Sequence, residues 1–137
     1  MTRALVLDAE ALNILARHDP RAVVPVQASL QAAYRLGHTV LVPAVILAEL
    51  YRGPHHNAVV DACLARETGI VVRDTDRAMA RTVGSVLAAA GAGSEDLADA
   101  HVIATAVEAG GGVVLTGDPD DLERLAGGHP GLTVQAV

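Results

Sequence analysis

Lysine, tryptophan and phenylalanine are absent from this 137-residue sequence, which contains a single cysteine. All ten basic residues are arginines, so any mechanism that depends on a lysine amine is excluded. Because Cys63 stands alone, no disulfide can form within the chain, and we expect a cytoplasmic protein. The two aromatic residues, Tyr34 and Tyr51, are too few for a surface that stacks nucleic-acid bases.

The sequence also lacks an apolar run long enough to cross a membrane. A membrane-spanning helix needs ~18 uncharged apolar residues, whereas the longest candidate, residues 39–48, contains a proline and stops at Glu49. No cationic segment followed by an apolar stretch opens the sequence. A chain of 137 residues with 51% apolar content suffices for one α/β domain and is too short for two. We therefore expect one domain, residues 1–137, with no membrane contact.

Negative charge is concentrated in the last third of the sequence. Residues 1–90 contain nine Arg and eight acidic residues, whereas residues 91–137 contain one Arg and eight acidic residues. Such segregation arises either from solvated loops or from carboxylates that surround a cation.

Five short apolar runs alternate with helical patterns, as in a parallel sheet with helices on both faces. We therefore predict an α/β fold with a five-stranded, mostly parallel sheet sandwiched between helices. The predicted strands are residues 4–7, 40–42, 70–72, 113–115 and 132–134. The predicted helices are residues 10–18, 22–36, 44–52, 58–66, 75–90, 96–109 and 119–126.

Two of the predicted strands run directly into an aspartate, Asp8 and Asp118. Ligands of parallel sheets bind beyond the carboxyl ends of the strands, so we expect these two carboxylates to converge. Each also has a purely structural interpretation. Asp8 precedes a helix and would serve as its N-cap, and Asp118 followed by Pro119 is typical of a helix start.

Three further acidic residues lie on predicted helices. Glu49 is the only charge in an otherwise apolar helix, so we expect it to be buried and to need a partner or a metal. The alternative is a surface ion pair with Arg52. Asp96 and Asp99 are three residues apart and share one helix face. Asp96 suits the positive end of the helix dipole, whereas Asp99 has apolar neighbours and is the stronger functional candidate.

Carboxylates gathered in one cleft need a cation. Each pair at ~4 Å repels by about 4 kcal/mol at an effective dielectric near 20. Ligands that are all carboxylate oxygen, without thiolate or paired histidines, indicate Mg²⁺ or Mn²⁺ rather than zinc. One or two such ions would activate water and stabilise the charge that develops on a phosphodiester. The residues therefore predict hydrolysis of a phosphate bond.

Four segments, in their order and spacing, resemble the PIN-domain ribonucleases over almost the whole chain, and specifically the VapC-type toxins of type II toxin–antitoxin systems. The segments are residues 5–8 (LVLD), 43–53 (PAVILAELYRG), 96–100 with 103–106 (DLADA and IATA), and 116–122 (TGDPDDL). The resemblance implies Mg²⁺- or Mn²⁺-dependent cleavage of RNA, a homodimer, and a cognate antitoxin that blocks the active site.

The resemblance also assigns the site residues. It implies a catalytic metal site of Asp8, Glu49, Asp99 and Asp118, in which Asp8, Asp99 and Asp118 hold the metal, with Asp96 nearby and Thr116 in support. One position departs from the family pattern, because Glu10 stands where many relatives carry Ser or Thr. This extra carboxylate either alters the metal number or preference, or faces solvent in the first helical turn, and we favour the second interpretation.

RNA recognition has little support from composition, because a net charge of −6 leaves no broad basic surface. Arg73, Arg77 and Arg81 recur every four residues. They would form a phosphate-facing stripe, or a solvated face paired with Asp74 and Asp76.

Other protein classes place aspartates at strand ends. Phosphoaspartyl receivers and haloacid-dehalogenase-like phosphatases do so, but both use a lysine that this sequence lacks, and a P-loop is excluded for the same reason. The remaining alternative is a non-catalytic PIN-like module for dimerisation or scaffolding, in which the acidic residues only cap helices.

Overall fold

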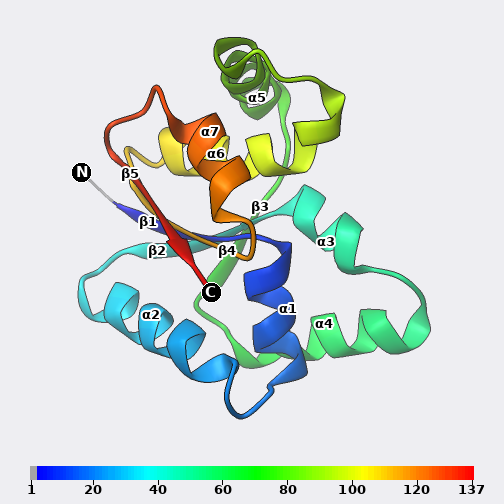
Figure 1. Ribbon diagram of the computed structural model, residues 1–137. Helices are drawn as coiled ribbons and strands as arrows, with labels where there is room; N and C mark the ends of the chain where they lie inside the picture. The colour runs from blue at the N-terminus through cyan, green and yellow to red at the C-terminus, as the bar shows by residue number, and fades with distance from the viewer. Residues whose placement is uncertain (1–2) are drawn as a thin grey trace.

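The computed structural model describes residues 3–137. Five strands form one sheet in the order β3-β2-β1-β4-β5 (Figure 1), and each pair of neighbouring strands is parallel. The strands are β1 (Ala4–Leu7), β2 (Thr39–Pro43), β3 (Ile70–Arg73), β4 (Gly112–Thr116) and β5 (Leu132–Ala136). The predicted α/β fold is confirmed, and the sheet is parallel throughout.

Seven α-helices connect the strands within residues 3–137. They are α1 (Ala9–Arg17), α2 (Val23–Arg35), α3 (Ala44–Leu50), α4 (Pro54–Arg66), α5 (Arg77–Ala90), α6 (Leu97–Glu108) and α7 (Pro119–Ala126), and a short 3-10 turn, η1 (Ser94–Asp96), precedes α6. All seven were predicted, but α4 begins four residues earlier than expected because Pro54 occupies its first turn, where proline is favoured. No helix in this range is both long and apolar enough to traverse a bilayer.

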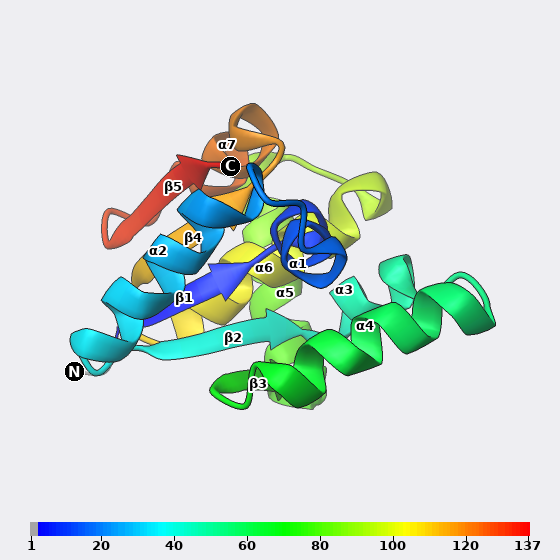
Figure 2. The ribbon, with the colours of Figure 1, turned by 90° about the horizontal axis from the view of Figure 1, so that it is seen from below.

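The helices cover both faces of the sheet. Helix α6 packs on β1, β2 and β4, α7 packs beside it and contacts β5, and α5 lies outside them, whereas α1 and α2 pack against the opposite face (Figure 1). Residues Ala100–Ala106 of α6 are all buried, so α6 is the central helix of the core. Viewed from below, the arrowheads of β1 and β2 point toward α1 and α3 (Figure 2).

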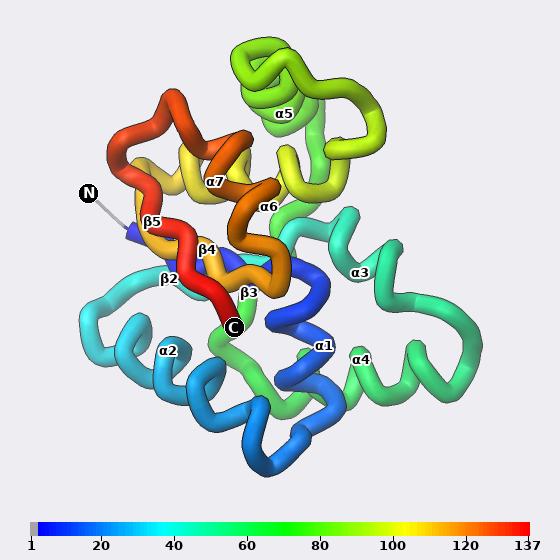
Figure 3. Tube along the Cα trace, in the orientation of Figure 1, coloured from blue at the N-terminus to red at the C-terminus, as the bar shows by residue number. Residues whose placement is uncertain are grey.

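The register between β1 and β4 fixes where the site lies. Leu7 is paired with Leu115, and the backbone N–H of Asp8 donates to the carbonyl oxygen of Leu115 at 3.1 Å. The first residue after β1 therefore lies beside the last residues of β4. The end of β5 runs to the same edge and approaches the start of α1 (Figure 3).

Candidate active site

Asp8 links the two central strands through its carboxylate. It lies at the N-cap of α1, where its Oδ1 accepts a hydrogen bond from the backbone N–H of Ala11 at 2.9 Å. Its Oδ2 accepts from the backbone N–H of Gly117 at 3.1 Å, just beyond β4. Only 6% of Asp8 is exposed. The capping interpretation of Asp8 is thus confirmed, and the same side chain also holds the loop that carries Asp118.

The loop after β4 is shaped by Thr116. Thr116 is fully buried, and its hydroxyl oxygen accepts the backbone N–H of Asp118 at 2.8 Å. Asp118 occupies the N-cap position of α7, but its side chain makes no capping hydrogen bond, and the residue is exposed. The carboxylate of Asp118 is therefore not used as a cap.

An open cleft of about 390 Å³ joins the ends of β1 and β4. Its lining residues are Asp8, Ala9, Glu10, Gly117, Asp118 and Val137. The predicted convergence of Asp8 and Asp118 is thus confirmed. Glu10 is exposed, as expected for a first-turn residue, yet it also lines this cleft.

Asp96 and Asp99 enter the site from the start of α6. One carboxylate oxygen from each, together with one from Asp121 on α7, lie within 4.8 Å of one another. The predicted shared face of Asp96 and Asp99 is therefore present. The three residues are each partly buried, so their charges are not fully screened by solvent.

Asp99 is the electrostatic centre of the site. Burial, followed by the negative charges of the carboxylates around it, raises its pKa to about 6. The surrounding carboxylates are those of Asp8, Glu49, Asp121 and Asp118, in order of decreasing effect. The other three acidic residues that the sequence singled out as catalytic therefore each lie close enough to Asp99 to affect its charge.

A second pair of acidic residues lies on α7. A hydrogen bond between the carboxyl groups of Asp118 and Asp121 raises the pKa of Asp118, with a smaller contribution from partial desolvation. The two residues are three positions apart, which places them on one face of the helix start. Asp121 was not among the candidate site residues predicted from the sequence. Its spacing from Asp118 was the signal that would have placed it in the cluster.

The expectation that Glu49 is buried is wrong. Helix α3 is only seven residues long, and it buries Ile46 and Leu50 while Glu49 remains exposed. The apolar composition of α3 suggested burial all round, but the helix packs through one side only. Nor is the alternative pairing with Arg52 present, since the Arg52 guanidinium donates to the carbonyl oxygens of Ala48 and Tyr51.

The three arginines do not form one uniform stripe. Arg73 lies on β3, and its guanidinium donates to both carboxylate oxygens of Glu108, at 2.9 and 2.8 Å. It also forms an ion pair with Asp76 at 3.4 Å. Arg77 and Arg81 lie on α5, are exposed, and have no ion pair within residues 3–137. The guanidinium of Arg73 is therefore already paired with acidic side chains, whereas the side chains of Arg77 and Arg81 remain accessible to solvent.

The acidic residues fit a divalent cation. Their donor atoms are all carboxylate oxygens, the ligands that Mg²⁺ and Mn²⁺ prefer. Three of these oxygens lie within 4.8 Å of one another, and burial together with the negative charge of the surrounding carboxylates raises the pKa of Asp99. A bound cation would compensate that charge.

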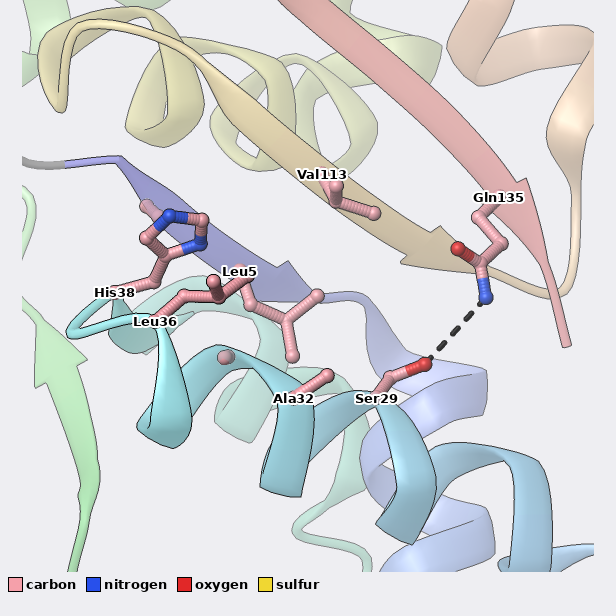
Figure 4. Close-up of a pocket in the computed structure, with 9 residues that line it drawn as sticks. Leu5, Ser29, Ala32, Leu36, His38, Val113 and Gln135 are labelled. Carbon is pink, nitrogen blue, oxygen red and sulfur yellow. Dashed lines mark hydrogen bonds between the residues drawn. The ribbon is translucent and has the colours of Figure 1, made fainter.

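A second cavity lies away from this cleft and has a different character. It has a volume of about 150 Å³ and lies between α2 and the strands β1, β4 and β5 (Figure 4). Its lining is mostly apolar, with a hydrogen bond from Gln135 Nε2 to Ser29 Oγ at 3.4 Å across one side. Leu5 of β1 and Val113 of β4 line this cavity together with His38, and none of its lining residues is acidic.

Comparisons with known proteins agree with this arrangement. The chain is similar in fold to the crystal structure of VapBC2 from Rickettsia felis bound to a DNA fragment from its promoter, with a TM-score of 0.66, 16% identity and 98% of each chain covered. It is also similar to DNA-bound VapBC from Salmonella typhimurium, with a TM-score of 0.63, 18% identity, and 99% of this chain and 98% of that chain covered. Among curated protein sequences, none matches the chain. The sequence pattern of the PIN domain matches residues 5–128. With nine-tenths of its sequence matched and its acidic residues gathered at the carboxyl edge of a parallel sheet, the chain belongs to the PIN-domain family.

Proposed function

We propose that this protein is a metal-dependent endoribonuclease, a hydrolase that cuts RNA phosphodiester bonds, and that it is the toxin of a toxin–antitoxin pair. One observation carries the proposal, which is that Asp8 and Asp118 share an open cleft at the carboxyl edge of the sheet, close to the partly buried Asp99. Membership of the PIN family supports it, because PIN domains are generally nucleases.

The proposed ligands of an Mg²⁺ or Mn²⁺ ion are Asp8, Asp99 and Asp118. Such an ion, when bound, lowers the pKa of water and stabilises negative charge on a phosphate group. Hydrogen bonds within the protein hold two of these ligands in place. Two backbone N–H groups hold the Asp8 carboxylate, and Thr116 holds the backbone of Asp118. Asp8 and Asp118 both line the open cleft of about 390 Å³.

Glu49 is the proposed proton acceptor. Its carboxylate is exposed, forms no ion pair within residues 3–137, and lies close enough to Asp99 to raise the pKa of that residue. In hydrolysis the oxygen of a water molecule forms a bond to phosphorus and the phosphodiester P–O bond breaks. Glu49 accepts the proton released by the water, and the leaving oxygen takes a proton from solvent.

RNA contact and partners belong to the same proposal. Arg77 and Arg81 are exposed on α5 and are the proposed phosphate contacts, whereas the ion pairs of Arg73 give that residue a structural role. The solved structures of similar fold are VapBC complexes bound to DNA. By analogy, we propose a cognate antitoxin as partner, a homodimer as the assembly and the cytoplasm as the compartment.

The test is cleavage of an RNA panel by the purified protein with Mg²⁺, with Mn²⁺ or with EDTA. We expect metal-dependent cleavage that is lost in Asp8→Asn and Asp99→Asn, and a fall of about 10²- to 10⁴-fold in Glu49→Gln. Asp74→Asn is the matched control, since Asp74 is exposed on a loop outside the cluster, and it should cleave like the wild type.

Two results would contradict the proposal. Cleavage that continues in EDTA would refute the metal dependence, and wild-type and variant proteins that are equally inactive on every RNA would favour the non-catalytic scaffold. The toxin assignment has its own readout, because expression of the wild-type protein should arrest growth and Asp99→Asn should not. Harmless expression of an active wild-type nuclease would refute the toxin role alone.

A further inference from the structure

Arg124 is the only arginine among residues 91–137, and its side chain contacts two residues of the acidic cluster, Asp96 and Asp121. Its Nη2 donates to Asp96 Oδ1 at 3.1 Å and lies 3.6 Å from Asp121 Oδ1. The hydrogen bond to Asp96 is the main cause of a raised pKa for Arg124, so this guanidinium stays charged. The cluster thus already holds one permanent cation that belongs to the protein.

The two residues that Arg124 contacts are also two of the three that come close enough to share a metal. One oxygen each from Asp96, Asp99 and Asp121 lie within 4.8 Å of one another. Oxygen ligands of one octahedral Mg²⁺ lie ~2.1 Å from the ion, and so at most about 4.2 Å apart. A small adjustment would therefore let these oxygens bind an ion. The guanidinium instead uses the oxygens of Asp96 and Asp121.

Asp99 lies near two sets of carboxylates. Asp96 and Asp121 share the single positive charge of Arg124. Asp8 and Asp118 share the open cleft and have no ion pair within residues 3–137. The guanidinium of Arg124 therefore pairs with Asp96 and Asp121, and not with Asp8 or Asp118.

We propose that Arg124 is a resident counter-ion that withholds Asp96 and Asp121 from the metal, so that the protein binds one divalent ion, at Asp8, Asp99 and Asp118, rather than two. This inference rests on the proposed metal-dependent function. Arg124 acts through the two aspartates and is therefore a positioning residue. It specifies how many ions the cluster takes.

The experiment counts Mn²⁺ ions bound to the full chain, by measuring free Mn²⁺ with electron paramagnetic resonance. We expect one ion in the wild type and two in Arg124→Gln, which removes the positive charge and frees both aspartates. The first ion should also bind about tenfold more tightly in Arg124→Gln, because one positive charge has left its neighbourhood. Arg124→Lys keeps the charge and should bind one ion, as the conservative control.

A second measurement avoids reliance on Arg124→Gln folding. Asp96→Asn in the wild-type background should still bind one ion, because Asp96 is not a ligand while Arg124 holds it. Its affinity should fall by about tenfold at most, which is the effect of losing one nearby negative charge. Loss of the bound ion, or a fall in affinity of about a hundredfold or more, would overturn the inference. Two ions in the wild type, one ion in a folded Arg124→Gln, or no bound ion in any variant would also overturn it.

RNA cleavage by the same preparations separates this inference from the proposed function. A wild-type protein that binds one Mn²⁺ but cuts no RNA would refute the nuclease assignment and leave the role of Arg124 intact. A wild-type protein that binds two Mn²⁺ and cuts RNA would refute the role of Arg124 and leave the nuclease assignment intact.

Discussion

Asp8 and Asp99 belong to one acidic cluster, yet the protein compensates their charges in different ways. The carboxylate of Asp8 accepts two backbone N–H groups, from Ala11 and Gly117. For Asp99, burial and the charges of neighbouring carboxylates raise its pKa to about 6, and no hydrogen bond contributes. The main chain thus stabilises the charge of Asp8 whether or not an ion is bound. The charge of Asp99 has no such hydrogen bonds, so without a metal ion the electrostatic cost of the cluster falls mainly on Asp99.

The largest expected effect comes from adding the metal. A ligand that binds only the folded state stabilises it by about 2.7 kcal/mol when its concentration is a hundred times the Kd. We expect Mg²⁺ or Mn²⁺ to raise the Tm of the wild type, and Asp99→Asn to abolish the gain. Differential scanning calorimetry over a metal titration measures it. A wild-type Tm that stays constant at high metal concentration would show that a cation does not stabilise the charge of Asp99, and the contrast with Asp8 would then be wrong.

The next effect appears without metal. In EDTA at pH 7, Asp99→Asn should raise the free energy of unfolding by about 1–3 kcal/mol, because the variant lacks a carboxylate that is costly to ionise. The pH dependence gives the sign. The folded-state pKa of about 6 exceeds the ordinary aspartate pKa of 3.8, so between these pH values the folded protein binds more protons than the unfolded chain. The penalty is therefore absent below about pH 4, and stability falls as the pH rises toward 6.

Urea denaturation at several pH values checks this effect. The advantage of Asp99→Asn over the wild type should be largest near pH 7 and should vanish near pH 4, where Asp99 is protonated in both states. An advantage that is the same at both pH values would mean that packing, rather than charge, separates the two proteins.

The smallest effect concerns Asp8, and its sign is opposite. Asp8→Asn should lower the free energy of unfolding by about 1 kcal/mol in EDTA. The oxygen of Asn can still accept from Ala11, as in many helix caps. Its amide group would then face the N–H of Gly117, which would lose its acceptor. Urea denaturation again measures the change, with Asp74→Asn as the control. A stability gain in Asp8→Asn would show that repulsion outweighs the backbone hydrogen bonds at Asp8 too.

Much of this architecture was predictable, because apolar periodicity is a local property. Strand β1 and helix α7 have the bounds that the sequence predicted, and the convergence of Asp8 and Asp118 follows from a parallel sheet. Burial of a helix face is not local. Helix α3 is as apolar as a core helix, but its neighbours cover only one side of it, and so Glu49 is exposed.

Ion pairs between residues that are distant in sequence could not be predicted either. Arg73 pairs with Glu108, 35 residues away, and Arg124 with Asp96, 28 residues away. No short-range pattern identifies such pairs, because they depend on how the helices and strands pack. In contrast, the three-residue spacing of Asp118 and Asp121 is local, and the argument applied to Asp96 and Asp99 would have found it.

The contact between Gly117 and the first turn of α1 makes two distant positions of the sequence dependent on each other. A Cβ atom at position 117 would lie 2.5 Å from Cγ and 2.7 Å from Cβ of Glu10, closer than such atoms ever approach. Any other residue at position 117 must therefore displace either the start of α1 or the loop that carries the Gly117 N–H, which donates to Asp8. Among natural variants of this chain, we therefore expect glycine at position 117 wherever position 10 has a side chain. Substitutions in the first and last acidic motifs would then depend on each other.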